Sequence, residues 1–170
     1  MAREEDTGKS QRQLKERVWD LAESIRVCMF ITRDGATQSA RPLDSTVRKD
    51  EHAVYFLTDV SGKKVAQIKK SSNVTLAFSD PGSFKFVSIT GTAKVSNDRA
   101  KIKDIWTATS KAWWDSADDP AIRLVTFVPK NAELWDSPNK LVSTVLMLTA
   151  AITGAKPKLG DHAKVAIPSG

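Results

Sequence analysis

The sequence has a single cysteine and only two histidines among its 170 residues. Cys28 therefore has no partner for an internal disulfide, and its apolar neighbours indicate a buried thiol. His52 and His162 lie in charged segments without partners at metal-ligand spacing. This argues against a metal site and against a serine–histidine triad.

The common nucleotide-binding motifs are absent as well. No G-x-G-x-x-G occurs, so a Rossmann dinucleotide site is not expected. Gly8, Lys9 and Ser10 resemble the end of a phosphate loop, but Arg3 stands where the first glycine of that loop would be. No strand precedes this segment, so a phosphate loop is not expected either.

Long apolar runs are missing too. The N-terminus begins with charged residues and has no apolar signal-peptide core. The most apolar stretch, 141–152, is about twelve residues long, against the ~20 needed to span a bilayer. We expect a core or interface helix there, no membrane role, and a cytoplasmic protein.

Charge is abundant and unevenly distributed. The formal net charge is +6, and residues 41–97 hold nine basic and five acidic side chains. This excess favours an anionic partner without naming one. Basic residues over 98–119 alternate with acids and form no stripe, so nucleic-acid binding is not favoured.

The spacing of apolar residues predicts short strands with a few helices. Apolar side chains recur every three or four residues over 11–25, which is typical of an amphipathic helix, and helical spacing returns at 62–70. Asp34 and Gly35, between two apolar runs, predict a hairpin turn. Strands are expected at 37–47, 53–58, 74–78, 84–95, 122–128 and 132–135.

Helical signals return after the longest of these strands. Asp98 is expected to cap a helix over 99–106, and a second helical piece reaches Trp114. The segment 129–131 separates the last two strands because it begins with proline. The tail is expected to hold one helix and then an irregular or short extended segment.

These elements predict an α+β fold that is mainly β with flanking helices. Six to seven short antiparallel strands with Greek-key-like connections argue for a barrel. Regular strand–helix alternation, typical of a doubly wound parallel sheet, is absent. We expect a disordered leader over 1–10, one domain over 11–150 and a C-terminal tail over 151–170.

The strongest candidate for a binding site runs from Phe56 to Lys64, where a strand ends and a helix begins. The first N–H groups of a helix lack internal partners and favour an anion. Thr58 adds a hydroxyl, Gly62 permits close approach, and Lys63 and Lys64 add positive charge.

The preceding strand adds one more candidate. Arg41 could bring a guanidinium group, which suits bidentate phosphate binding, beside the start of this helix. Spacing alone leaves an alternative open, a solvated lysine pair on an ordinary surface helix. Lys69 and Lys70 repeat the same pattern further along that helix.

Several segments, taken in order, resemble the pyridoxamine 5′-phosphate oxidase-like flavin-binding split barrels, and most of all their general stress protein subgroup. The resemblance spans about 11–150, and order and spacing make it more specific than any single motif. The segments that carry it are ARPL at 40–43, FLTDVSGKKVAQI at 56–68, FVP at 127–129 and KNAELWDSP at 130–138.

The resemblance implies a split barrel that binds FMN, or alternatively FAD, at the interface of a homodimer. Arg41, Lys63 and Lys64 would bind the FMN phosphate, and Thr58 would bond to the phosphate or the ribityl chain. Trp135 would lie near the isoalloxazine of the other subunit. The implied cofactor-binding set is Arg41, Thr46, Leu57, Thr58, Lys63, Lys64 and Trp135.

Two departures from the oxidases limit what the resemblance implies. Thr46 stands where the oxidases carry a lysine, five residues after the arginine of the second strand. Their Arg-x-His-Asp signature has no match in 136–140. Flavin binding is therefore expected, whereas oxidation of pyridoxamine phosphate is not.

The sequence leaves several functional hypotheses open. An FMN-dependent oxidoreductase, a flavin store and a stress-linked redox protein all fit the resemblance, and no acid or base stands out as catalytic. A cofactor-free dimeric structural module is the alternative from another class. In that case Trp135 is a core or dimer contact, and we expect Trp106, Trp113 and Trp114 to be packing residues in either case.

Overall fold

The strands of the protein are β1 (Val27–Asp34), β2 (Thr37–Asp44), β3 (Thr46–Arg48), β4 (Ala53–Asp59), β5 (Asn73–Asp80), β6 (Lys85–Ser96), β7 (Ile122–Asp136) and β8 (Asp161–Ala166). The helices are α1 (Gln11–Ile25), α2 (Lys63–Lys70), α3 (Arg99–Asp104) and α4 (Lys140–Thr153), with a short 3-10 segment, η1 (Ala108–Ala112). This computed structural model describes residues 9–137, 140–154 and 161–168, and for 140–146 and 161 the backbone alone. Residues 1–8 of the expected leader lie outside the described residues.

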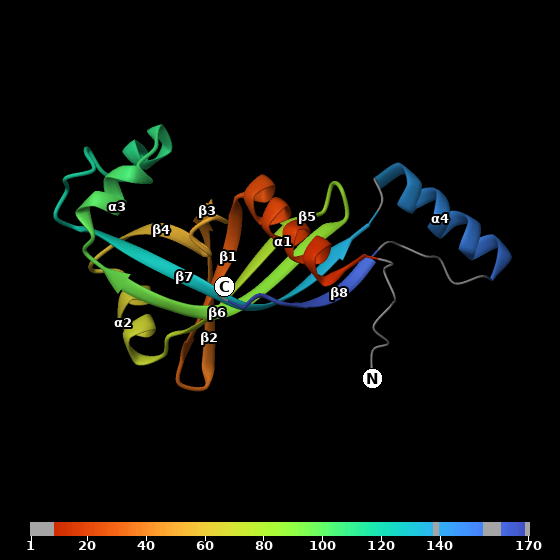
Figure 1. Cartoon of the computed structure of the whole chain (residues 1–170), viewed down its shortest axis with the longest axis horizontal. Helices are drawn as coiled ribbons and strands as arrows, with labels where there is room; N and C mark the ends of the chain where they lie inside the picture. The colour runs from red at the N-terminus through yellow and green to blue at the C-terminus, as the bar shows by residue number, and fades with distance from the viewer. Residues whose placement is uncertain (1–8, 138–139, 155–160, 169–170) are drawn as a thin grey trace.

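The strands form one antiparallel sheet in the order β2-β1-β5-β6-β7-β4-β3, and β8 pairs with β7 (Figure 1). The two end strands of this order, β2 and β3, are consecutive along the chain, so the sheet curls back on itself. The predicted fold class, an antiparallel split barrel with flanking helices, is confirmed, and the described residues form eight strands in place of six to seven.

Ser45 separates β2 from β3, where a single strand over 37–47 was predicted. Its backbone N–H and its hydroxyl both donate to the carbonyl of Arg26, at 3.1 and 2.6 Å. These bonds fix the chain at the point where it passes from β2, at one end of the strand order, to β3, at the other end. The prediction of one strand is wrong because it was based on alternation, which does not register such a turn.

β7 is one strand where two were predicted. In its pairing with β6, Gly91 lies opposite Pro129 and Thr90 lies opposite Asn131, so Lys130 is an extra residue in a β-bulge. Proline has no N–H for the ladder, and a bulge is one of the few places where a strand tolerates it. The predicted break at 129–131 is wrong for this reason.

α1 covers the barrel with the face that its spacing predicts. Leu14, Val18 and Leu21 are buried, and the helix packs against β3, β5, β6 and β8. Ser10 begins the helix with a capping box. The Ser10 side chain accepts a hydrogen bond from the Gln13 N–H, and the Gln13 side chain accepts one from the Ser10 N–H. The helix over 11–25 is confirmed.

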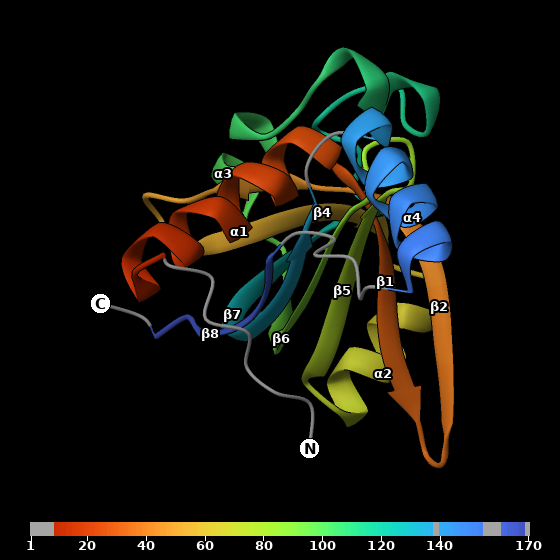
Figure 2. The same cartoon turned by 90° about the vertical axis from the view of Figure 1, so that its right-hand side faces the viewer.

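α2 and α3 also agree with the sequence patterns. α2 packs against β1 and β6, and Figure 2 shows it beside the hairpin of β1 and β2. That hairpin turns at Gly35, whose φ of 64° favours glycine. Asp98 caps α3 as predicted, by accepting a hydrogen bond of 3.0 Å from the Lys101 N–H.

The C-terminal elements differ in how they join the barrel. α4 extends beyond the sheet in Figure 1, and Leu148 and Ile152 are 61% and 86% exposed. These two side chains therefore lie outside the core of the single chain. β8 pairs with β7 and buries Ala163 and Val165, so this part of the expected tail 151–170 belongs to the sheet. Within the described ranges, no helix has the length and apolar character needed to cross a bilayer.

Candidate functional site

A cavity of about 420 Å³ lies where β2 and β4 meet α2 and η1. Arg41, on β2, and Thr58, near the end of β4, come from two strands of the barrel, and Lys64 comes from the first turn of α2. The sequence therefore brings three donors to one cavity from three separate elements. We call this part of the cavity the cationic end.

Two buried donors at the cationic end lack partners. Thr58 is 1% exposed, and its Oγ1 has no hydrogen-bond partner among the described residues. The Nη1 atom of Arg41 is also buried without a partner there. An unsatisfied buried polar group costs about 1–3 kcal/mol, so such atoms point to an acceptor supplied by a ligand.

The backbone passes close to these donors at Gly62. A Cβ atom there would lie 3.1 Å from the carbonyl oxygen of Asp59, 3.7 Å from the Thr58 Oγ1 and 3.8 Å from the Lys64 Nζ. Gly62 is also the N-cap of α2, and no side chain caps the helix there. The space next to the hydroxyl and the ammonium thus adjoins a helix N-terminus, which favours an anion.

The charged forms of both cations at this end are disfavoured, as the direction of each pKa shift indicates. Burial lowers the pKa of Arg41 from its usual value. The pKa of Lys64 is lowered first by burial and then by the charge of Arg41, while Asp59 acts in the opposite direction. A bound anion would relieve both effects, because it offsets the repulsion and replaces lost hydration.

Arg41 is held from behind by two buried polar side chains. Its Nη2 donates to the Gln67 Oε1 at 2.8 Å and to the Thr32 Oγ1 at 3.2 Å. The Thr32 hydroxyl in turn donates to the same Gln67 oxygen at 2.6 Å. Thr32 and Gln67 are 0% and 6% exposed, so this triangle lies in the interior.

Other residues that line the cavity have different chemistry. Arg26 and Asp44 form a two-pronged ion pair with both bonds at 2.6 Å, and the Arg26 Nη2 also reaches the Thr109 Oγ1 at 3.2 Å. Arg26 has a φ of 67°, in the left-handed region. Trp113, just after η1, also lines the cavity and is 79% exposed.

The structure brings most of the predicted site residues together. Lys63 is the exception on α2: it is exposed and does not line the cavity, although Lys64 does. Neighbouring residues on a helix point about 100° apart, so only one of the two lysines can face inward. The predicted residues that line the cavity are Arg41, Thr46, Leu57, Thr58 and Lys64.

Trp135 lies away from this cavity in the same chain. It is near the end of β7, 38% exposed, and stacks on His162 with ring centroids 4.9 Å apart. The predicted contact from another subunit concerns a partner chain and stays a prediction.

Sequence reasoning missed several residues of the site. The sequence does not mark Thr32 or Gln67 as site residues, because each is a single polar residue within an ordinary strand or helix pattern. Trp113 was expected to pack, which is wrong, since it is exposed at the cavity. Trp106 and Trp114 do pack, against the cluster around Tyr55 and Ile102, and Trp114 also lines the cavity.

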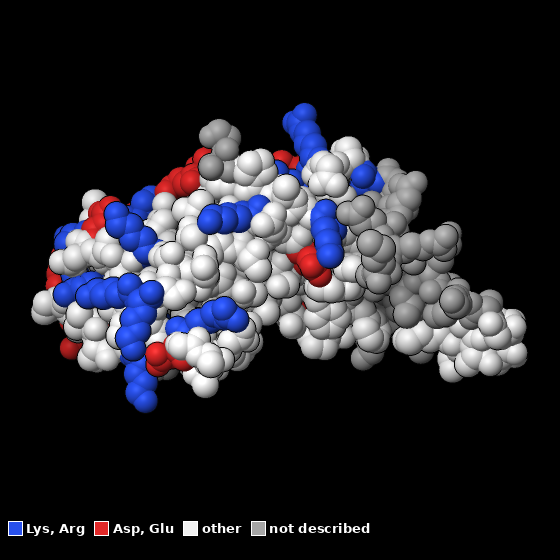
Figure 3. Space-filling model, turned by 90° about the horizontal axis from the view of Figure 1, so that it is seen from below, with Lys and Arg blue, Asp and Glu red and all other residues white. Residues whose placement is uncertain are grey.

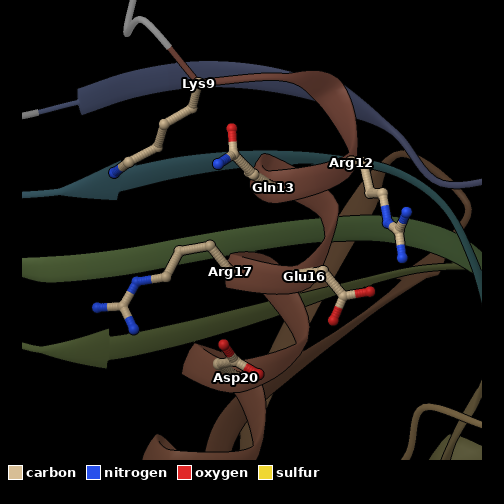
Figure 4. Close-up of a pocket in the computed structure, with 6 residues that line it drawn as sticks. All are labelled: Lys9, Arg12, Gln13, Glu16, Arg17 and Asp20. Carbon is tan, nitrogen blue, oxygen red and sulfur yellow. The ribbon is translucent and has the colours of Figure 1, made fainter.

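A second hollow, of about 260 Å³, lies along α1 and has no convergent chemistry. Its lining residues belong to α1 or directly precede it. Figure 4 shows Lys9 and Arg17 extending to one side of the helix, and Arg12 and Glu16 to the other. Glu16 is paired with Lys49. This hollow is the charged outer face of a helix, and the cavity at β2 and β4 is the candidate site.

The family model of the proteins described as pyridoxamine 5′-phosphate oxidase like matches residues 13–158. The chain belongs to this family. The match includes every element that lines the cavity, so the cationic end is part of the family domain. A comparison of this chain with curated proteins found no match.

Solved structures of similar fold include general stress proteins. A candidate general stress protein 26 from Jannaschia sp. CCS1 is 24% identical, with 92% of this chain and 99% of that chain covered and a TM-score of 0.73. General stress protein 26 from Bacillus anthracis str. Sterne is 20% identical, with 75% and 96% covered and a TM-score of 0.67. The general stress FMN/FAD binding protein from Xanthomonas citri is 26% identical, with 76% and 91% covered and a TM-score of 0.65.

This member of the oxidase-like family should become slightly more stable without ligand when Lys64 is replaced by methionine. A lysine whose pKa is lowered by folding costs stability while it is charged. The cost fades as the pH rises from the lowered pKa toward 10.5, the usual value. Because Lys64 is only half-buried and solvent screens the effect, we expect a gain of well below about 1 kcal/mol for Lys64→Met at neutral pH.

The matched control is Lys63→Met, which removes the same charge from the exposed neighbour. Its stability should stay within about 0.5 kcal/mol of the original. Urea unfolding in phosphate-free buffer measures both variants. A clear loss of stability in Lys64→Met would mean that this lysine supports the fold rather than a ligand.

Proposed function

We propose that this protein binds flavin mononucleotide, with the FMN phosphate between Arg41, Thr58 and Lys64. The observation that carries the proposal is a pair of buried donors, Arg41 Nη1 and Thr58 Oγ1, that have no partner in the described part of the chain and lie in one cavity with Lys64. Phosphate oxygens accept from both donors and supply the negative charge that two adjacent cations require. The similarity to the FMN/FAD binding protein from Xanthomonas citri supports the same class of ligand.

The rest of the cavity is suited to a flavin beyond its phosphate. Its volume of about 420 Å³ is in the range of about 300–1,000 Å³ that is usual for small-molecule sites. Leu57 and Ile105 provide apolar wall, and Thr46 provides a hydroxyl. These residues orient the ligand and exclude water, while bound FMN would supply hydride or single-electron transfer. FAD, which needs room for its adenylate half as well, is the alternative cofactor.

The proposal includes a homodimer with the flavin at the subunit interface. Trp135 is partly exposed and lies outside the cavity of its own chain, which leaves it available to a partner. In such a dimer Trp135 of one protomer lies near the isoalloxazine held by the other. Light scattering of the FMN-loaded protein measures the mass of the assembly, and a monomer would contradict this part.

A redox or flavin-handling role in the stress response, in the cytoplasm, completes the proposal. Thr46 lines the cavity and supplies no positive charge where the oxidases carry a lysine. Turnover of pyridoxamine phosphate is therefore not expected. Screening the FMN-loaded protein against NADH, NADPH and pyridoxamine phosphate, with flavin absorbance as the readout, identifies the donor.

Titration with FMN and with riboflavin tests the proposal, because riboflavin lacks only the phosphate. Two charge-assisted contacts of about 1.5 kcal/mol or more each predict that FMN binds at least about 100-fold more tightly. Equal affinities would contradict the phosphate assignment. Absence of binding by either flavin would instead support the cofactor-free structural module.

Nucleic-acid binding is not favoured by the surface. On the face in Figure 3, several basic side chains gather at the left with acidic groups beside them, and the other basic side chains are separated by uncharged surface, so no continuous basic stripe crosses this face. If the protein were retained on DNA, and this retention fell steeply as the salt concentration rises, the interpretation that it does not bind nucleic acid would be wrong.

A further inference from the structure

Three polar side chains from three elements meet behind the cationic end. Thr32 is on β1, Arg41 on β2 and Gln67 on the inner face of α2. In the pairing of β1 with β2, Arg41 lies opposite Phe30, two residues from Thr32. α2 packs against β1, which brings Gln67 to the same point.

The hydrogen bonds of this triangle engage only the Nη2 atom of Arg41. The Gln67 oxygen accepts two bonds, at 2.6 Å from Thr32 and 2.8 Å from the Arg41 Nη2, which uses both of its lone pairs. The Thr32 hydroxyl donates to Gln67 and accepts from the Arg41 Nη2. The Nη1 atom is buried and has no partner among the residues described.

The charge of position 67 matters as much as its geometry. Glutamine holds the guanidinium with a neutral oxygen, so the positive charge of Arg41 stays uncompensated. A carboxylate of the same length could accept the same bonds, but it would neutralise Arg41 and repel an anion. Gln67 therefore fixes the guanidinium group of Arg41 without neutralising its positive charge.

We propose that Gln67 and Thr32 are positioning residues that give the site its preference for the phosphorylated form of the flavin, without touching the ligand. Their hydrogen bonds engage the Nη2 atom of Arg41 inside the protein, which leaves the Nη1 atom to donate to a phosphate oxygen. This inference rests on the proposed FMN site. A purely structural role, in which the triangle only satisfies buried polar groups, is the competing explanation.

Gln67→Glu separates the two explanations. The carboxylate can keep both bonds, so we expect folding to be retained and the urea midpoint to be unchanged or higher. We expect FMN affinity to fall by about 30-fold or more, because the charge of Arg41 is neutralised. Riboflavin affinity should stay within about threefold, a difference of about 0.6 kcal/mol.

Thr32 supplies an independent pair of variants. Thr32→Val keeps the shape but removes the hydroxyl, and it should lower the FMN-to-riboflavin affinity ratio by about tenfold. Thr32→Ser restores the hydroxyl and should restore most of the ratio. If FMN and riboflavin affinities fall together, or if the ratio is unchanged in Gln67→Glu and Thr32→Val, the positioning role is wrong. If the original protein shows no preference for FMN, the proposed function itself fails and this inference falls with it.

Discussion

Replacing Arg41 by methionine is expected to weaken FMN binding by about 30- to 150-fold, the equivalent of about 2–3 kcal/mol. Arg41 contributes a full charge and the buried Nη1 donor, and methionine keeps much of the apolar stem while removing both. Riboflavin affinity should change by less than about threefold, since the lost contacts belong to the phosphate. Flavin absorbance or fluorescence titration measures both ligands.

Arg48→Met is the matched control for this loss. Arg48 is also half-buried, on β3, and its Nη1 donates to the carbonyl of Val47 at 3.4 Å, but it does not line the cavity. The variant removes the same net charge and should bind FMN normally. Equal losses in the two variants would show an effect of overall charge, and full affinity in Arg41→Met would refute the phosphate site.

Gly91→Ala is expected to destabilise the fold by about 3 kcal/mol or more, despite adding a single methyl group. A Cβ atom at this position would lie 2.2 Å from the carbonyl oxygen of Val128 and 2.9 Å from the Cα of Pro129. Both are backbone atoms of the bulge in β7, so the contact cannot be relieved by a side-chain rotation. Urea unfolding measures the loss, and failure to accumulate folded protein is its extreme form.

Gly82→Ala is the control, because it makes the same chemical change in a turn. The nearest atom to its Cβ would be the Asp80 Oδ1 at 3.3 Å, the end of a side chain that can move. Its cost should stay below about 1 kcal/mol. Similar costs for both variants would mean that the bulge can shift and that Gly91 is not needed for close approach.

Much of the fold could be predicted because its signals are local. The period of α1, the Asp98 cap and the hairpin at Gly35 depend on residues within one turn or one hairpin. The errors fell where a distant residue decided the outcome. Ser45 ends β2 through the carbonyl of Arg26, and the bulge at Pro129 is accommodated by Gly91 on another strand.

The sequence by itself determined the ingredients of the candidate site: a strand end, a glycine and a helix start rich in lysine, with an arginine on an earlier strand. Tertiary structure decided which of these groups meet. The docking of α2 turns Lys64 toward the cavity and Lys63 toward solvent, and it brings Gln67 to Thr32 and Arg41. The physical reason is that residue type and local period are written along the chain. The direction in which a side chain faces, and the burial that changes its pKa, depend on how separate elements pack.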